Sequence, residues 1–176
     1  MINSFSKHYA LAEYRVGWVI ADKQLIGDRY SGLISRTRGL MGNPPKASND
    51  AILKLLQIEK TRYQDGVYAL EGFTNTLYET EKYAREELSK IHDIEILETD
   101  ACFNITIRVL NASSDIDLAR KLMEKGTMIM PCEGYGYDKK DSVMRITFAE
   151  RKERVEHCLD TLKKVVSNLP HKNIYE

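Results

Sequence analysis

Apolar and polar positions follow two different periods along this chain, and the period changes several times. Aromatic and β-branched residues fill the segment from Tyr14 to Ile20, which predicts a strand. The next stretch, Lys23–Arg38, carries apolar residues three or four positions apart and predicts a helix. Gly42–Pro45 interrupts that pattern, and Ser48–Asp50 are capping residues ahead of a second helix that is expected to begin near Ile52.

The part of the chain after Thr61 predicts a layered domain. Its expected elements, in order, are a long helix over Thr61–Ile91, strands at Ile94–Leu97 and Phe103–Val109, a helix over Ile116–Met123, strands at Thr127–Met130 and Val143–Phe148, and a last helix over Arg151–Leu169. The second of these strands alternates strictly between apolar and polar residues, as a strand with one buried face does. We therefore expect the α/β class, with an α+β layer in which helices pack on a small mixed sheet.

The balance of charged residues bears on which classes of partner the chain can bind. The chain has 176 residues, with 26 lysines and arginines against 26 aspartates and glutamates. Without a basic excess there is no chain-wide attraction for nucleic acids or anionic membranes, so neither is expected as a partner. The first residues form no charged or apolar leader, and the longest apolar run, Val16–Ala21, is too short to span a bilayer. We expect a cytoplasmic protein.

The cysteines and histidines predict neither a disulfide framework nor a metal site. Cys102, Cys132 and Cys158 are odd in number and lie far apart in the sequence. They are expected to be buried or half-buried free thiols. None of the four histidines has the spacing of a metal-ligand pair, so no metal is expected.

A short N-terminal motif contains the residue types that bind a phosphate and an aldehyde. Lys7 follows Ser4 and Ser6, and Arg15 comes eight residues later. An enzyme that uses pyridoxal phosphate needs an amine for a Schiff base and hydroxyl and guanidinium donors for the phosphate. It also needs a turn that brings these groups to one end of adjacent elements. The motif offers all three, although a lysine this close to a chain end can equally be a solvated surface residue.

The segment resembles the lysine region of the class I/II aminotransferases, the fold-type I pyridoxal phosphate enzymes. The matching residues are Ser4, Ser6, Lys7, Ala10, Leu11, Arg15, Val16 and Gly17. The resemblance implies pyridoxal 5′-phosphate as the cofactor, Lys7 as the catalytic Schiff-base lysine, and Ser4, Ser6 and Arg15 as cofactor ligands. Glu13 departs from the family, which usually has Gly or Asn there, and a positive φ at this position would strain the turn.

A second match lies in the C-terminal part of the chain. Val143–Ala149 resembles the strand whose arginine binds the α-carboxylate of the substrate in these enzymes. Strand alternation places Met144, Ile146 and Phe148 on one face and Arg145 on the other. A guanidinium suits a carboxylate because two of its N–H groups can pair with the two oxygens. The resemblance implies Arg145 as a substrate ligand, whereas taken alone it is more often a surface residue of a strand.

A third segment, Arg38–Pro45, is similar to a loop of the aspartate-type members. There an arginine five residues before Asn-Pro-Pro reaches the neighbouring subunit and pairs with the distal carboxylate of the substrate. The similarity implies Arg38 as a second substrate ligand, a dicarboxylic amino acid as substrate, and a homodimer. Alternatively, Arg36 and Arg38 are only the cationic last turn of a helix, which the helix dipole favours. Cys132–Gly136 matches a glycine-containing loop of the family and receives no role.

The resemblance covers nearly the whole chain but only the C-terminal part of a family member. It implies a remnant of the large cofactor domain over residues 1–60 and the small C-terminal domain over residues 61–176. In family members the segment that holds the pyridine ring precedes the lysine, and the six residues before Lys7 cannot contain it. We therefore expect a fragment or one part of a split enzyme, which associates with a second copy or with the missing segment.

The expected function is the transfer of an amino group between an amino acid and a 2-oxo acid. The 176-residue chain by itself is expected to be inactive. Two alternatives stay open. One is a non-catalytic remnant or interaction module of the same fold, and the other is a pyridoxal phosphate-dependent lyase or synthase, because the same lysine and anion sites serve all of these reactions.

Overall fold

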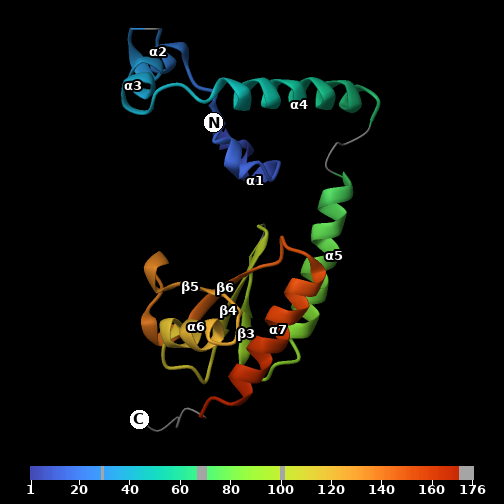
Figure 1. Cartoon of the computed structure of the whole chain (residues 1–176). Helices are drawn as coiled ribbons and strands as arrows, with labels where there is room; N and C mark the ends of the chain where they lie inside the picture. Colours follow the sequence, from blue (N-terminus) through green and yellow to red (C-terminus); the bar gives the residue numbers. More distant parts are fainter. Residues whose placement is uncertain (29, 67–70, 100–101, 171–176) are drawn as a thin grey trace. The chain divides into compact units, whose positions relative to one another are not determined.

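The structure is a computed structural model that describes residues 1–28, 30–66, 71–99 and 102–170. It divides the chain into two compact units, Met1–Glu71 and Gly72–Glu176 (Figure 1). Each unit has its own sheet and its own buried cluster. They are therefore considered one at a time.

The first unit is built around a short hairpin and a long helix. Its elements are β1 (Ile2–Ser4), α1 (Phe5–His8), the 3₁₀ helix η1 (Ala12–Tyr14), β2 (Gly17–Val19), α2 (Lys23–Ile26), α3 (Gly32–Met41) and α4 (Lys46–Gln64). Strands β1 and β2 pair antiparallel. Phe5, Val16 and Ile52 form its buried cluster. Because these residues come from α1, the start of the β2 arm and α4, the cluster ties the hairpin to the long helix.

Two elements of the first unit differ from the sequence prediction. The expected strand over Tyr14–Ile20 is shortened to β2, because η1 occupies the chain up to Tyr14. The expected helix over Lys23–Arg38 is broken into α2 and α3. At the break, the Asp28 carboxylate accepts hydrogen bonds from the backbone N–H groups of Tyr30 and Ser31. Such local side-chain bonds compete with helical ones, so the helix stops and restarts.

The second unit has a four-stranded sheet with three helices. Its elements are α5 (Glu71–Leu88), β3 (Ile94–Leu97), β4 (Asn104–Val109), α6 (Asp115–Met123), β5 (Met130–Pro131), the 3₁₀ helices η2 (Glu133–Tyr135) and η3 (Lys139–Asp141), β6 (Val143–Thr147) and α7 (Lys152–Ser167). The strand order is β3-β4-β6-β5. All three pairings are antiparallel, so this sheet is antiparallel rather than mixed.

The core of the second unit lies between one face of that sheet and helices α5, α6 and α7 (Figure 1). The strands contribute alternate residues to it, among them Ile105 and Ile107 of β4 and Met144 and Ile146 of β6. The residues between them stay half-buried or exposed on the other face, apart from the first residue of β6. Alternation predicted this division, because successive side chains of a strand point to opposite faces.

The fold class expected from the sequence is confirmed, and three element boundaries are corrected. The long helix expected over Thr61–Ile91 is two helices, since α4 ends at Gln64 and α5 ends at Leu88; residues 67–70 lie outside the described part. Ser48–Asp50 lie inside α4 rather than ahead of it, because that helix begins directly after Pro45. The strand expected over Thr127–Met130 is only the two-residue β5. Among the described helices, none has the length and apolar character to cross a bilayer.

Candidate functional site

The residues of the N-terminal motif meet at one end of the β1–β2 hairpin. Ser4 is the last residue of β1, pairs with Gly17, and is followed directly by α1, which carries Ser6 and Lys7. The backbone N–H of Phe5 donates to the carbonyl of Val16 at 3.2 Å, which closes the corner. Arg15 immediately precedes Val16, so the hydroxyl-bearing and guanidinium-bearing segments leave the hairpin at the same end. This is the turn that the motif predicts.

The strain of this corner falls on Arg15 rather than on Glu13. Glu13 lies inside η1, whereas Arg15 ends that helix in the left-handed region, with φ of 55° and ψ of 38°. The Arg15 guanidinium donates to the carbonyl of Ala12 at 3.2 Å, which folds the side chain back over the turn. Glu13 is therefore tolerated here, because its position does not require the positive φ that would have strained the turn. A non-glycine residue held in this region often marks a constrained functional turn.

The donors at the corner suit the phosphate and aldehyde ends of pyridoxal phosphate. Ser4 is the N-cap of α1, yet its hydroxyl makes no capping hydrogen bond. That hydroxyl and the Arg15 guanidinium are the neutral and charged donors that a phosphate requires. The side chain of Lys7 is exposed and supplies a primary amine on the same helix. The residues at this corner thus fit two parts of pyridoxal phosphate, its phosphate and its aldehyde.

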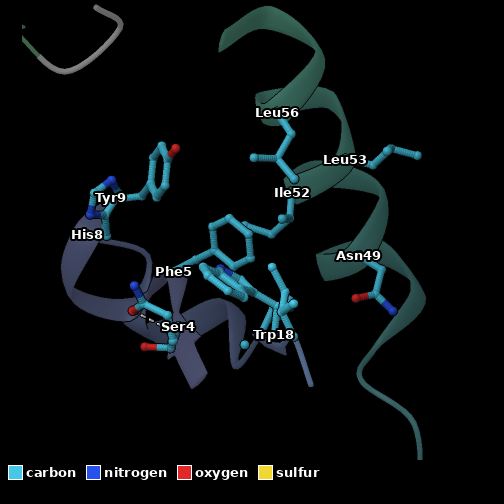
Figure 2. Close-up of a pocket in the computed structure, with 13 residues that line it drawn as sticks. Ser4, Phe5, His8, Tyr9, Trp18, Asn49, Ile52, Leu53 and Leu56 are labelled. Carbon is cyan, nitrogen blue, oxygen red and sulfur yellow. Dashed lines mark hydrogen bonds between the residues drawn. The ribbon is translucent and has the colours of Figure 1, made fainter. Parts of the chain in front are cut away.

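Beside the corner, the first unit has an apolar groove of about 630 Å³. Figure 2 shows the rings of Phe5 and Trp18 directed toward Ile52 of α4, with Ser4 at the edge of the groove. Lys7 and Arg15 do not line it. The groove and the charged corner are therefore neighbouring features that share Ser4.

A hydrogen bond fixes α1 against α4. The Tyr9 hydroxyl donates to the carboxylate of Glu59. Burial, followed by the hydrogen bond and the negative charge of Glu59, raises the pKa of Tyr9 to about 12. Tyr9 is the C-cap that directly follows α1, so this bond holds the helix that carries Lys7. The sequence predicts no role for Tyr9, because the spacing of Tyr9 and Glu59 gives no sign of their contact.

In the second unit, Arg145 lies on the face of the sheet opposite the core. Its neighbours Met144 and Ile146 are fully buried, whereas Arg145 is half-buried. Within the described part of the chain its guanidinium has no ion pair or hydrogen bond, and its Cζ lies 4.9 Å from the ring centroid of Tyr135. The alternation predicted for this strand is confirmed. The guanidinium can therefore bind a carboxylate without first breaking a hydrogen bond or ion pair to another described residue.

Tyr135 belongs to a loop that Asp115 holds in place. The Asp115 carboxylate is 1% exposed and accepts hydrogen bonds from the backbone N–H groups of Cys132 and Glu133, both at 2.8 Å. The sequence pattern indicates no role for Asp115 or for the Cys132–Gly136 loop. The one available signal is that an aspartate in the first turn of a helix complements the helix dipole. That signal does not indicate a contact 17 residues away.

The structure does not bring Arg38 to the corner. Arg38 is exposed in the last turn of α3, where its carbonyl accepts the N–H of Gly42 at 3.1 Å. The sequence-predicted residues thus fall into three places: Ser4, Ser6, Lys7 and Arg15 at the hairpin corner, Arg38 on α3, and Arg145 on β6.

The cysteines differ in exposure. Cys132 is buried and Cys158 is half-buried, as expected, but Cys102 is exposed, so that part of the prediction was wrong. Burial raises the pKa of Cys158 to about 11. Burial also raises the pKa of Cys132, with the positive charge of Arg145 acting in the opposite direction. Among the described residues, no cluster of three or more His, Cys, Asp or Glu side chains could hold a metal ion.

Comparison with known proteins identifies the family. The family described as aminotransferase class I and II matches residues 1–162, which is most of the chain. The chain belongs to the class I and II aminotransferases. Members of this family use pyridoxal phosphate, which agrees with the donors found at the hairpin corner.

Solved aminotransferases share the fold of this family member. A pyridoxal phosphate-dependent aminotransferase from Streptococcus suis superposes with a TM-score of 0.78 at 19% identity, over 98% of this chain and 42% of its own. An aminotransferase from Mycobacterium tuberculosis gives a TM-score of 0.77 at 24% identity, over 94% of this chain and 41% of its own. At these identities the likeness concerns the fold alone.

Curated relatives are similar over a shorter stretch. A histidinol-phosphate aminotransferase of Campylobacter jejuni strain RM1221 is 28% identical over 135 residues, which is 77% of this chain and 32% of the relative. A histidinol-phosphate aminotransferase of Campylobacter hominis is 24% identical over 165 residues, which is 94% of this chain and 39% of the relative. The chain therefore spans about a third of the length of the curated relatives it matches.

Proposed function

We propose that this chain supplies the lysine, phosphate-binding and carboxylate-binding residues of a pyridoxal phosphate aminotransferase. The reaction transfers an amino group between an amino acid and a 2-oxo acid. The observation that carries the proposal is the hairpin corner, where Ser4, Lys7 and Arg15 leave adjacent elements at the same end. The family membership supports this assignment.

Each residue at the corner has a distinct task in this proposal. The amine of Lys7 holds the cofactor at its aldehyde carbon and then moves a proton at the α-carbon of the substrate. The hydroxyls of Ser4 and Ser6 and the guanidinium of Arg15 bind the phosphate through donated hydrogen bonds. The cofactor, when bound, supplies the electron sink that makes the α-proton acidic. The Tyr9–Glu59 hydrogen bond keeps α1, and with it Lys7, in a fixed orientation.

Arg145 binds the α-carboxylate of the substrate. The support is its place on the non-core face of the sheet, half-buried and without an ion pair among the described residues. A carboxylate that pairs with it gains two charge-assisted hydrogen bonds in a fixed plane. The same guanidinium orients the substrate, because both carboxylate oxygens must face it.

The two units correspond, in this proposal, to parts of two domains. Residues 1–60 are a remnant of the large cofactor domain, and residues 61–176 are the small C-terminal domain. The matched aminotransferases are more than twice as long as this chain, so we infer that these residues need a further segment or a second copy for turnover. Exposed apolar residues in the first unit, with Leu40 86% and Met41 83% exposed, support association as a homodimer. The assembled enzyme acts in the cytoplasm.

Arg38 points to a substrate with a second negative charge. It is exposed near the end of α3, before the Asn43–Pro45 segment that resembles the aspartate-type loop. We propose a dicarboxylic amino acid, such as aspartate, as the substrate. The names of the curated relatives favour a second candidate, histidinol phosphate, whose phosphate is also an anion that an arginine can bind. Turnover of aspartate and of histidinol phosphate, compared in the assembled enzyme, separates the two.

Alternative functions make different predictions for Lys7. A non-catalytic module of the same fold has no use for a lysine that captures the cofactor. A lyase or synthase captures it but does not pass the amino group to 2-oxoglutarate. The decisive observations are therefore cofactor capture first and amino transfer second.

Cofactor capture can be measured on the full chain with pyridoxal phosphate as the titrant. We expect a saturable change in cofactor absorbance that is lost in Lys7→Ala and kept in Lys23→Ala, a matched lysine on α2 of the same unit. Aspartate and 2-oxoglutarate are then added. Capture without turnover supports the proposal that further residues are required. An equal change in wild type and in Lys7→Ala would contradict the role of Lys7.

A further inference from the structure

Arg145 has a rigid backbone, and its guanidinium lies over an aromatic ring. Its residue pairs with Thr106 of β4 on one side and with Met130 of β5 on the other, so its Cα is fixed within the sheet. The side chain carries a 4.9 Å contact to the Tyr135 ring and, among the described residues, no hydrogen bond or ion pair. The ring is therefore placed where it can orient the guanidinium.

Tyr135 is itself held by its loop rather than by packing of its ring. The residue is 59% exposed. The loop is anchored through its first two residues, Cys132 and Glu133, whose N–H groups donate to the buried Asp115 carboxylate. The turn closes at Gly136, whose φ of 93° favours glycine. The buried Asp115 carboxylate at the start of α6 thus anchors the loop that carries the exposed Tyr135 ring.

We propose that Tyr135 is a positioning residue for Arg145 and that Asp115 acts through Tyr135. This inference rests on the proposed function, in which Arg145 binds the substrate carboxylate. The face of an aromatic ring attracts a cation but does not take up its N–H donors as a carboxylate would. The ring can therefore orient the guanidinium while leaving its donors for the substrate. Restricting the side chain in advance reduces the entropy that is lost on binding.

The test uses the ¹⁵N-labelled full chain and the Nε–H signal of Arg145, which is assigned by its loss in Arg145→Lys. We expect Tyr135→Ala to shift this signal away from its ring-influenced position and to increase its fast motion, while Tyr135→Phe keeps both properties. Asp115→Asn should give an intermediate change. Tyr137→Ala, which removes another exposed tyrosine two residues further on, is the matched control. An unchanged Arg145 signal in Tyr135→Ala overturns the inference.

A titration with 2-oxoglutarate on the same samples separates this inference from the proposed function. We expect Tyr135→Ala to weaken binding about three-fold, as for a partly exposed cation–π contact, and Tyr135→Phe to restore it. If Arg145→Lys leaves the affinity unchanged, the carboxylate role of Arg145 fails, and the Nε–H signal still decides the positioning role. If Arg145→Lys abolishes binding while Tyr135→Ala leaves it unchanged, the positioning role alone fails.

Discussion

Removing the buried Asp115 carboxylate should strongly destabilise the second unit, although the carboxylate is a small group. Asp115→Ala deletes two hydrogen bonds to the loop, at 2.8 Å each, and one to the backbone N–H of Ile116 at 2.9 Å. Hydrogen bonds to a charged group contribute about 1.5–3 kcal/mol each. The N–H of Cys132 keeps a second acceptor, the carbonyl of Val143 at 3.0 Å, so its loss costs less. The bonds to Glu133 and Ile116 alone, taken at the lower end of that range, give a decrease of at least about 3 kcal/mol in the free energy of unfolding.

Asp115→Asn should cost about half as much, because one amide oxygen can still accept the two loop N–H groups while the amide nitrogen faces the N–H of Ile116. The assay is urea denaturation followed by circular dichroism, with the same slope required for all variants. Asp117→Asn is the matched control, since this aspartate lies in the same first turn but pairs with Arg120 at the surface. If Asp115→Ala lies within about 0.5 kcal/mol of the control, the anchoring role of Asp115 is refuted.

Four further predictions concern core packing, thiol reactivity, the pH dependence of stability and substrate choice. Leu122→Ala should lower the free energy of unfolding by about 2–5 kcal/mol, because Leu122 is fully buried, whereas Met123→Ala at the next position, which is 60% exposed, should change it by less than about 0.5 kcal/mol. Equal losses for the two variants in urea denaturation would contradict the assignment of Leu122 to the core. Iodoacetamide at pH 8 should label the exposed Cys102 first and Cys158 far more slowly, because burial raises the pKa of Cys158 to about 11. The labelling rates are measured by peptide mass spectrometry, with the urea-unfolded chain as the control, and equal rates for the two cysteines in the folded chain would refute the prediction. Since that pKa is raised only in the folded chain, Cys158 also makes stability fall as the pH rises toward 11, and Cys158→Ala should flatten this dependence. In the assembled enzyme, Arg38→Ala should reduce kcat/KM far more for aspartate than for alanine, and the loss of transition-state stabilisation for aspartate should be about 2–4 kcal/mol. Arg36→Ala is the control, and equal losses on both substrates would exclude a role of Arg38 in binding a dicarboxylate.

Elements with one strong period could be predicted from the sequence. The alternation in β4 and β6 correctly assigned buried and open faces, including the place of Arg145, because a strand has a fixed side-chain period. The helix expected over Ile116–Met123 is also present as α6, and Ser114 caps it by accepting the N–H of Asp117 at 3.3 Å. These features depend on residues close together in the sequence.

Features that depend on local competition or on distant contacts could not be predicted. The break between α2 and α3 results from the Asp28 carboxylate bonding to nearby backbone, which periodicity does not register. Glu13 lies inside the 3₁₀ helix η1 and Arg15 adopts the left-handed conformation, which the sequence pattern does not indicate. The contact of Asp115 with the loop at Cys132 joins segments 17 residues apart, and only the folded sheet brings them together.

The same distinction applies to the candidate site. The motif around Lys7 could be recognised because its residues are neighbours along the chain, and the hairpin then brings Arg15 to the same corner. Tyr9 and Tyr135 could not be assigned from spacing, since their partners Glu59 and Arg145 are separated from them by 50 and 10 residues.

The most direct test of the central claim is to locate the lysine that captures pyridoxal phosphate. The full chain is mixed with the cofactor, borohydride makes the lysine–cofactor link permanent, and peptide mass spectrometry identifies the labelled residue. We predict saturable label on Lys7, with a lower yield in Arg15→Ala because the phosphate loses its guanidinium partner. Label spread evenly over Lys7, Lys23 and Lys46, unaffected by Arg15→Ala, would contradict the assignment of the hairpin corner as the cofactor site.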